Sequence, residues 1–149
     1  MPDGSKNKKT TKRLFLIVDD EEDIRLLLRG FLERAGSRVL TAKDAEEALR
    51  ICHRLSCRID ALVTDVQLPG LSGFDLAELA ARLRPEMPVL FISGSFRARE
   101  EAIARHLMPR RGFLQKPFTA EALSQKLALV MTPPACLPAP ARSQIARAS

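Results

Sequence analysis

Polar residues that could carry out a group transfer follow four of the five short apolar runs in this sequence. Asp19 and Asp20 follow the first run, Asp65 the third, Ser93 the fourth and Lys116 the fifth. Three carboxylates held close together repel one another, and a hard divalent cation such as Mg²⁺ relieves that repulsion. With an ammonium and a hydroxyl group beside them, they suit an in-line phosphoryl transfer in which a carboxylate is the nucleophile.

These residues can act together only if the elements that carry them place them side by side. Buried strands are expected at residues 14–18, 38–42, 59–63, 88–92 and 112–115, and each is followed by an amphipathic helical segment. Five alternations of strand and helix predict a parallel sheet with helices on both faces and right-handed crossovers. The carboxyl ends of all the strands would then meet at one edge, where ligands bind in such sheets.

Capping residues mark the ends of the predicted helices. Asp44, Ser72 and Thr119 each precede a helical segment and offer a side-chain oxygen to its first turn. Gly36 is a plausible end for the first helix, whose apolar face contains Ile24, Leu27, Leu28, Phe31 and Leu32. A weaker helix is expected over residues 97–108, around Ala102, Ile103 and Leu107.

The net charge of +6 lies in the ends of the chain. Residues 1–13 carry +4 and residues 132–149 carry +2, so residues 14–131 carry no net charge. We therefore expect a disordered basic tail (1–13), a folded domain (14–131) and a disordered tail rich in alanine and proline (132–149). A neutral domain is not typical of nucleic-acid binding. With no signal peptide and no membrane-spanning apolar run, a cytoplasmic location is expected.

The three cysteines do not indicate a metal or redox site. Cys52, Cys57 and Cys136 show neither zinc-ligand nor redox spacing. His53 follows Cys52 directly, and adjacent helical side chains point about 100° apart, so they would not converge on one ion.

Four segments together resemble the receiver domain of bacterial two-component response regulators. They are Leu16–Glu22, Thr64–Gly73, Ile92–Ser95 and Phe113–Phe118, and the resemblance extends from about Leu14 to Met131. It implies a flavodoxin-like (βα)5 fold with strand order 2-1-3-4-5 and a cis peptide bond between Lys116 and Pro117.

The resemblance also implies roles for individual residues. Asp65 would be the phosphoacceptor, and Asp19, Asp20 and Asp65 would bind Mg²⁺ with the backbone carbonyl of Gln67. Lys116 and Ser93 would hold the phosphoryl oxygens, and Ser93 with Phe113 would form the switch. Gln67 replaces a common Asn or Met, and Phe113 replaces a common Tyr; neither change removes a group that the transfer requires.

The function expected from this resemblance is that of a phosphoacceptor and not of an enzyme. A histidine kinase or a histidine phosphotransfer protein would phosphorylate it, and it would signal through altered contacts with an output protein. A homodimer through the 97–131 face is possible, whereas membrane and nucleic acid are not expected partners. Because the 18 residues after Met131 are too few for an effector domain, a stand-alone receiver is expected.

Three alternatives remain beside this function. A phosphatase of the haloacid dehalogenase type also uses a strand-end aspartate with Mg²⁺, but it needs a second aspartate where this chain has Gln67. A receiver-like scaffold that is not phosphorylated would normally lack Asp65, Lys116 or an acidic-pocket residue. A receiver that only drains phosphoryl groups, with no output partner, fits the sequence as well.

Overall fold

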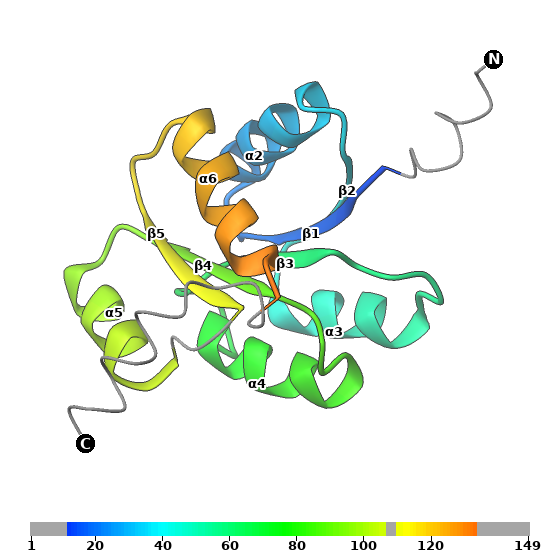
Figure 1. Cartoon of the computed structure of the whole chain (residues 1–149). Helices are drawn as coiled ribbons and strands as arrows, with labels where there is room; N and C mark the ends of the chain where they lie inside the picture. The colour runs from blue at the N-terminus through cyan, green and yellow to red at the C-terminus, as the bar shows by residue number, and fades with distance from the viewer. Residues whose placement is uncertain (1–11, 107–109, 134–149) are drawn as a thin grey trace, which may run out of the picture.

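The chain folds into one five-stranded parallel sheet with helices on both faces (Figure 1). The structure is a computed structural model, and it describes residues 12–106 and 110–133. Helices α2 and α6 cover one face of the sheet, and α3, α4 and α5 cover the other. The predicted fold class is therefore confirmed.

The strands are β1 (Leu14–Val18), β2 (Arg38–Ala42), β3 (Ala61–Asp65), β4 (Val89–Ser93) and β5 (Arg111–Gln115). Their order across the sheet is β2-β1-β3-β4-β5, and every neighbouring pair is parallel, as predicted. All residues of β1, β3 and β4 are buried. Continuous apolar runs form these strands because helices cover both sides of the sheet.

The helices are α2 (Glu22–Arg34), α3 (Ala45–Arg54), α4 (Gly73–Leu83), α5 (Phe96–Glu101) with the following π-helix η1 (Ala102–His106), and α6 (Ala120–Met131). The predicted caps of α3, α4 and α6 are confirmed. The side chains of Asp44, Ser72 and Thr119 accept backbone hydrogen bonds from the residue three positions further on. Gly36 follows α2 with a φ of +96°, a left-handed conformation that glycine adopts without steric cost.

The hydrophobic core consists of two layers, one on each face of the sheet. Side chains that alternate along a strand point to opposite faces, so Leu16 and Leu62 belong to one layer and Ile17 and Val63 to the other. The first layer packs against α3, α4 and α5, and the second packs against α2 and α6. Helices on both sides therefore fix the strands, and with them the positions of the strand ends.

Several expected elements differ from those observed, and the fourth and fifth strands differ by one residue at their ends. The third strand is Ala61–Asp65 rather than 59–63, so Asp65 is its last residue. Before it, the side chain of Asp60 accepts a hydrogen bond from the backbone N of Leu14 (2.8 Å), which holds this segment beside β1 outside the regular ladder. Leu27 on α2 is 43% exposed, because it lies at the margin of the buried stripe that contains Leu28.

The helix expected at residues 97–108 begins at Phe96 and changes into the π-helix η1 at Ala102. Of the apolar residues expected on one face, Ala102 is buried whereas Ile103 is 49% exposed, because adjacent helical side chains point in different directions. Leu107, the last apolar residue named for this helix, lies outside the described residues.

Several predictions for the ends of the chain also fall outside the described residues. Residues 1–11 and 134–149, which make up most of the two predicted tails, are among them, as is Cys136. Cys52 is buried and Cys57 is exposed. Within residues 12–106 and 110–133, no helix has the length and apolar character needed to cross a membrane.

Candidate functional site

Three carboxylates meet at the carboxyl edge of the sheet. Asp19 directly follows β1, and Asp65 is the last residue of β3, the neighbouring strand. One carboxylate oxygen from each of Asp19, Asp20 and Asp65 lies within 4.8 Å of the other two. Asp19 and Asp65 are buried and Asp20 is exposed, so the cluster opens to solvent on one side. This set of oxygen donors fits a hard divalent cation such as Mg²⁺.

The side chain of Lys116 extends into this cluster from the end of β5. Its Nζ lies 3.6 Å from Oδ2 of Asp65 and 3.4 Å from Oδ2 of Asp19. The backbone N of Lys116 donates to the carbonyl of Ser93 (3.0 Å), and the Lys116–Pro117 peptide bond is cis. The lysine therefore has a fixed backbone position from which its ammonium group contacts two of the three carboxylates.

Burial and neighbouring charges change the acidity of Asp65. Removal from water raises the pKa of the Asp65 carboxyl group above its ordinary value of 3.8, and the Lys116 ammonium group opposes this increase. The charge of Asp19 raises the same pKa further, the backbone N–H of Gln67 lowers it, and the charge of Asp20 raises it. A cation bound between the carboxylates would relieve the repulsion that these shifts reflect.

The other predicted residues lie close to this cluster in the fold. Ser93, the last residue of β4, is buried and lies one position beyond Ile92, which pairs with Asp65 across the sheet. Its Oγ accepts a hydrogen bond from the backbone N of Ser95 (3.1 Å). Gln67 is exposed, and its backbone N donates to Oδ1 of Asp65 (3.3 Å).

Phe113 lies apart from the carboxylates, inside the core. It is in the middle of β5, is 8% exposed and belongs to the core layer that faces α4 and α5. The fold thus brings together Asp19, Asp20, Asp65 and Lys116, with Ser93 and Gln67 beside them, whereas Phe113 is buried below.

Two residues that support the site were not singled out from the sequence. The guanidinium group of Arg25 donates to the backbone carbonyl of Asp19 (2.6 Å) from the first turns of α2. Gly73 opens α4, and a Cβ atom at this position would lie 2.2 Å from the carbonyl oxygen of Asp65. The only sequence signal was a glycine directly after the Ser72 cap, which can indicate close approach of another backbone. Nothing in the sequence pattern pairs Arg25 with Asp19.

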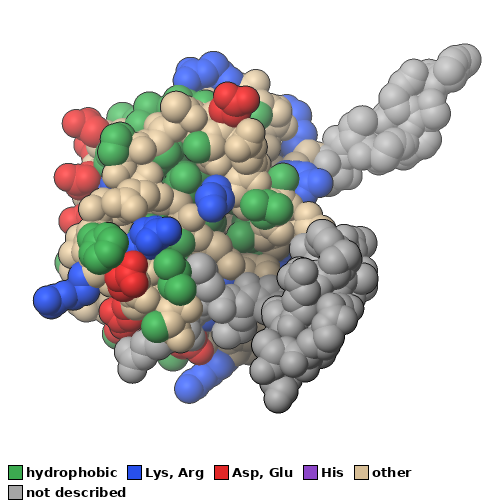
Figure 2. All heavy atoms as spheres, turned by 60° about the vertical axis from the view of Figure 1, so that its left-hand side comes forward, with side chains coloured by type: hydrophobic (Ala, Val, Ile, Leu, Met, Phe, Trp, Pro, Cys, Tyr) green, Lys and Arg blue, Asp and Glu red, His purple; other side chains and the backbone are tan. Residues whose placement is uncertain are grey.

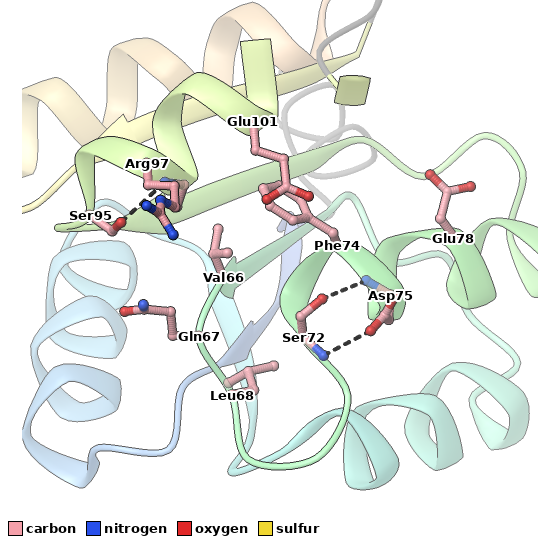
Figure 3. A pocket seen from close by; sticks show the side chains of 11 residues that line it. Val66, Gln67, Leu68, Ser72, Phe74, Asp75, Glu78, Ser95, Arg97 and Glu101 are labelled. Atoms are coloured by element: carbon pink, nitrogen blue, oxygen red, sulfur yellow. Dashed lines mark hydrogen bonds between the residues drawn. The ribbon is translucent and has the colours of Figure 1, made fainter. Parts of the chain in front are cut away.

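A groove of about 840 Å³ adjoins the carboxylate cluster (Figure 3). Its walls come from three segments: Val66, Gln67 and Leu68 after β3, the first half of α4, and the residues from Ser95 to Glu101. Figure 3 also shows the two reciprocal hydrogen bonds between Ser72 and Asp75 that cap α4. The three carboxylates of the cluster do not line this groove, but its walls begin directly after Asp65 and shortly after Ser93.

Comparison with known proteins agrees with this geometry. The family model of the response regulator receiver domain matches residues 15–128. The chain belongs to this family. Receiver domains are modules of two-component signalling, and this receiver shares their (βα)5 architecture in full.

Individual relatives support the assignment. The receiver is 34% identical over 115 residues to the chemotaxis protein CheY of Pseudomonas aeruginosa. The aligned segment covers 75% of this chain and 90% of that protein. Its structure matches a response regulator receiver domain protein from Clostridium thermocellum (TM-score 0.71, 31% identity, 80% and 94% of the two chains). The structure of CheY4 of Vibrio cholerae matches with a TM-score of 0.70 and 30% identity, over 80% of this chain and 99% of CheY4.

Other relatives are much longer proteins. The sensor kinase/phosphatase LuxN of Vibrio campbellii is 35% identical over 112 residues, which make up 75% of this chain and 13% of LuxN. The chain likewise covers 24% of the nitrogen assimilation regulatory protein NtrX of Azorhizobium caulinodans. Related receivers thus occur both in proteins of similar length and as parts of larger ones.

Proposed function

We propose that this receiver accepts a phosphoryl group on Asp65, with Mg²⁺ bound by Asp19, Asp20, Asp65 and the backbone carbonyl of Gln67. The observation that carries the proposal is the position of the Lys116 ammonium group beside the buried Asp65 carboxylate, within a cluster of three carboxylates. An aspartate whose only task was structural would not need both a like-charged cluster and a lysine from the far strand.

Each residue has a role in the proposed transfer. A carboxylate oxygen of Asp65 attacks the phosphorus, the P–N bond of a phosphohistidine donor breaks, and the donor imidazole leaves with that electron pair. Bound Mg²⁺ supplies positive charge to the transferring oxygens. Lys116 binds one of these oxygens, and the hydroxyl group of Ser93 donates a hydrogen bond to another.

The proposed donor is a histidine kinase or a histidine phosphotransfer protein. Two relatives carry the name of a sensor kinase, LuxN and CckA of Brucella abortus, and both contain a segment similar to this receiver. The activity that we propose for the chain is assistance to its own phosphorylation and dephosphorylation, because the charged groups of the cluster in the described part of the chain surround the Asp65 carboxylate.

We further propose that the output surface is formed by α5, η1, β5 and α6, that is, by the 97–131 face together with Phe96 at the start of α5. Figure 2 looks onto this side of the molecule and shows hydrophobic side chains among basic and acidic ones. Phe96, Ile103 and Leu129 are 69%, 49% and 61% exposed on these helices. Such a surface suits an output protein or a second copy of this chain.

The proposed receiver unit is residues 14–131, from the start of β1 to the end of α6. A fragment of residues 12–133 tests this boundary. We expect it to be phosphorylated at the rate of the full chain, and a loss of phosphorylation or of folding would mean that residues outside it take part.

Phosphorylation by acetyl phosphate with Mg²⁺ tests the central proposal. We expect intact-mass spectrometry to show one added phosphoryl group, and peptide analysis to place it on Asp65. Asp65→Asn should abolish the modification, because an amide is not a nucleophile. Asp23→Asn, a matched change at an exposed position in the first turn of α2, should leave it unchanged. Modification of Asp65→Asn at the normal rate would overturn the proposal.

A further inference from the structure

A second cavity lies at the amino edge of the sheet, on the opposite side from Asp65. It has a volume of about 470 Å³, and three arginines line it together with Glu86 and mostly apolar residues. Arg58 precedes β3, Arg84 precedes β4 and Arg110 directly precedes β5. Because the strands are parallel and adjacent, these three arginines meet at one edge. Neither the carboxylate cluster nor the groove beside it shares a residue with this cavity.

Two of the arginines have structural partners. Arg84 donates hydrogen bonds to the backbone carbonyls of Cys52 (3.0 Å) and Cys57 (2.9 Å), and also to that of Leu55. These bonds satisfy carbonyls at and beyond the end of α3. Arg58 is 73% exposed and pairs with Asp60 at 3.4 Å. Capping and a surface ion pair therefore account for much of what Arg84 and Arg58 do.

Arg110 is different, because its side chain is 19% exposed and only partly paired. Its Nη1 lies 3.3 Å from Oε1 of Glu86, a side chain that is 90% exposed. Its Nε is buried and has no hydrogen-bond partner among the described residues. A buried N–H group of a cation without an acceptor is costly, and an anion bound at the same guanidinium group would offset part of that cost.

The backbone of Arg110 is also held in an unusual conformation. Its φ is +74°, in the left-handed region that side-chain-bearing residues rarely adopt, while its carbonyl accepts a hydrogen bond from the backbone N of Val89 (2.9 Å). A glycine would meet this φ without strain. A strained arginine with an unpaired buried donor, in a cavity that two further arginines line, is the pattern of a binding position.

We propose that this cavity binds the phosphate group of a small phosphorylated molecule. Three positive charges line it against the one negative charge of Glu86, and Asp60 adds a second negative charge at the margin beside Arg58. A guanidinium group can present its two Nη groups together to two oxygens. A phosphate monoester has three terminal oxygens to share among several guanidinium groups, whereas a carboxylate has two, so phosphate fits better.

The resonance of the Arg110 side-chain Nε–H group reports binding at its guanidinium group. In Mg²⁺-free buffer, we expect inorganic phosphate and AMP to shift this ¹⁵N–¹H resonance saturably, whereas acetate and adenosine should not. Phosphate that shifts the amide of Lys116 and leaves Arg110 unchanged would be bound at the carboxylate edge, and this would overturn the proposal. A non-saturable shift, or an equal response to acetate, would overturn it as well.

Two variants of Arg110 separate binding from folding. Arg110→Lys keeps the charge but removes the two Nη donors of the guanidinium group, and Arg110→Gly removes the side chain while relieving the strained φ. We expect both to fold and to bind phosphate at least about tenfold more weakly, the effect of losing one charge-assisted hydrogen bond. Arg29→Gln, which loses the same charge as Arg110→Gly but on the surface of α2, should bind phosphate like the wild type. Wild-type affinity in Arg110→Gly would overturn the proposal.

Discussion

The ammonium group of Lys116 lies 3.6 Å from the carboxylate of Asp65, although β4 separates the strands that carry the two residues. The lysine follows β5 and reaches across the end of β4, where Ser93 accepts its backbone N–H. Three adjacent strands therefore contribute one residue each to the same position. A change in the stagger of these strands would separate the groups that the proposed transfer needs.

Metal binding should depend on the exposed carboxylate of the cluster. Asp20→Ala removes one of the three carboxylates proposed to bind Mg²⁺, while leaving the buried Asp19 and Asp65 in place. We expect Mg²⁺ affinity to fall by about tenfold or more, and phosphorylation by acetyl phosphate to slow at subsaturating Mg²⁺. Isothermal titration calorimetry measures the affinity. Asp23→Ala is the control, and an Asp20→Ala protein with unchanged Mg²⁺ affinity would contradict the assignment.

The raised pKa of Asp65 predicts how stability depends on pH. In the folded state this carboxyl group holds its proton more tightly than in the unfolded chain, chiefly because it is buried. Protonation therefore contributes stability that is fully present below the ordinary pKa of 3.8 and is lost as pH rises through the folded pKa. Without Mg²⁺, Asp65→Asn should accordingly be more stable than the wild type at pH 7.

Urea denaturation in EDTA, repeated from pH 7 down to about pH 4, measures this difference in the free energy of unfolding. The advantage of Asp65→Asn should shrink as pH falls, since the wild-type carboxyl group becomes protonated as well. Asp23→Asn, at an exposed position, should show no such gain. If the stability advantage of Asp65→Asn grew toward low pH, burial could not be the cause of the raised pKa of Asp65.

Gly73 should be essential to the shape of the site. Because a Cβ atom there would lie 2.2 Å from the carbonyl oxygen of Asp65, Gly73→Ala must push α4 away from the end of β3. We expect a loss of about 1–3 kcal/mol in the free energy of unfolding and slower phosphorylation. Gly30→Ala is the matched control, because the nearest atoms to its Cβ belong to the Arg34 side chain at 3.5 Å or more.

The control variant Gly30→Ala should change the free energy of unfolding in the opposite direction. Gly30 lies inside α2, where alanine is favoured over glycine by about 0.5–1 kcal/mol, so Gly30→Ala should stabilise the protein. Urea denaturation distinguishes the two changes. If Gly73→Ala were stabilising too, the close approach of α4 to Asp65 would not constrain the site.

Ser93 should couple phosphorylation to the proposed output surface. A new hydrogen bond from its hydroxyl group to a phosphoryl oxygen, worth about 1.5–3 kcal/mol, would shift a two-state equilibrium roughly ten- to a hundredfold. Ser93→Ala should still accept phosphate on Asp65, but more slowly. Because the Phe113 ring is already buried in this structure, the response should appear mainly in α5 and η1 rather than in further burial of the ring.

Amide chemical shifts with and without beryllofluoride and Mg²⁺ measure this coupling. In the wild type we expect changes over α5, η1, β5 and α6, largest in α5 and η1, and in Ser93→Ala these should be largely lost. Ser124→Ala, at an exposed position on α6, is the control for loss of a hydroxyl group. A full response in Ser93→Ala would place the coupling in another residue.

Local sequence determined most of the elements of this receiver. The apolar runs of β1, β3 and β4 are long enough only for buried strands, and Asp44, Ser72 and Thr119 start their helices through side-chain hydrogen bonds within four residues. The family resemblance supplied the strand order and the candidate residues. The regular alternation of strand and helix was sufficient to predict that Asp19, Asp65 and Lys116 would meet at one edge.

The tertiary structure decided what depends on contacts between distant segments. The contact of Gly73 with the Asp65 backbone, the hydrogen bond from Arg25 to Asp19, and the cavity around Arg110 join segments that no local pattern connects. The change from α5 to the π-helix at Ala102 likewise departs from the regular period that sequence patterns assume. The sequence alone could thus name the reactive side chains, because local forces place each at a strand end. Only packing set the distances between them, because those distances depend on how whole strands and helices are seated against one another.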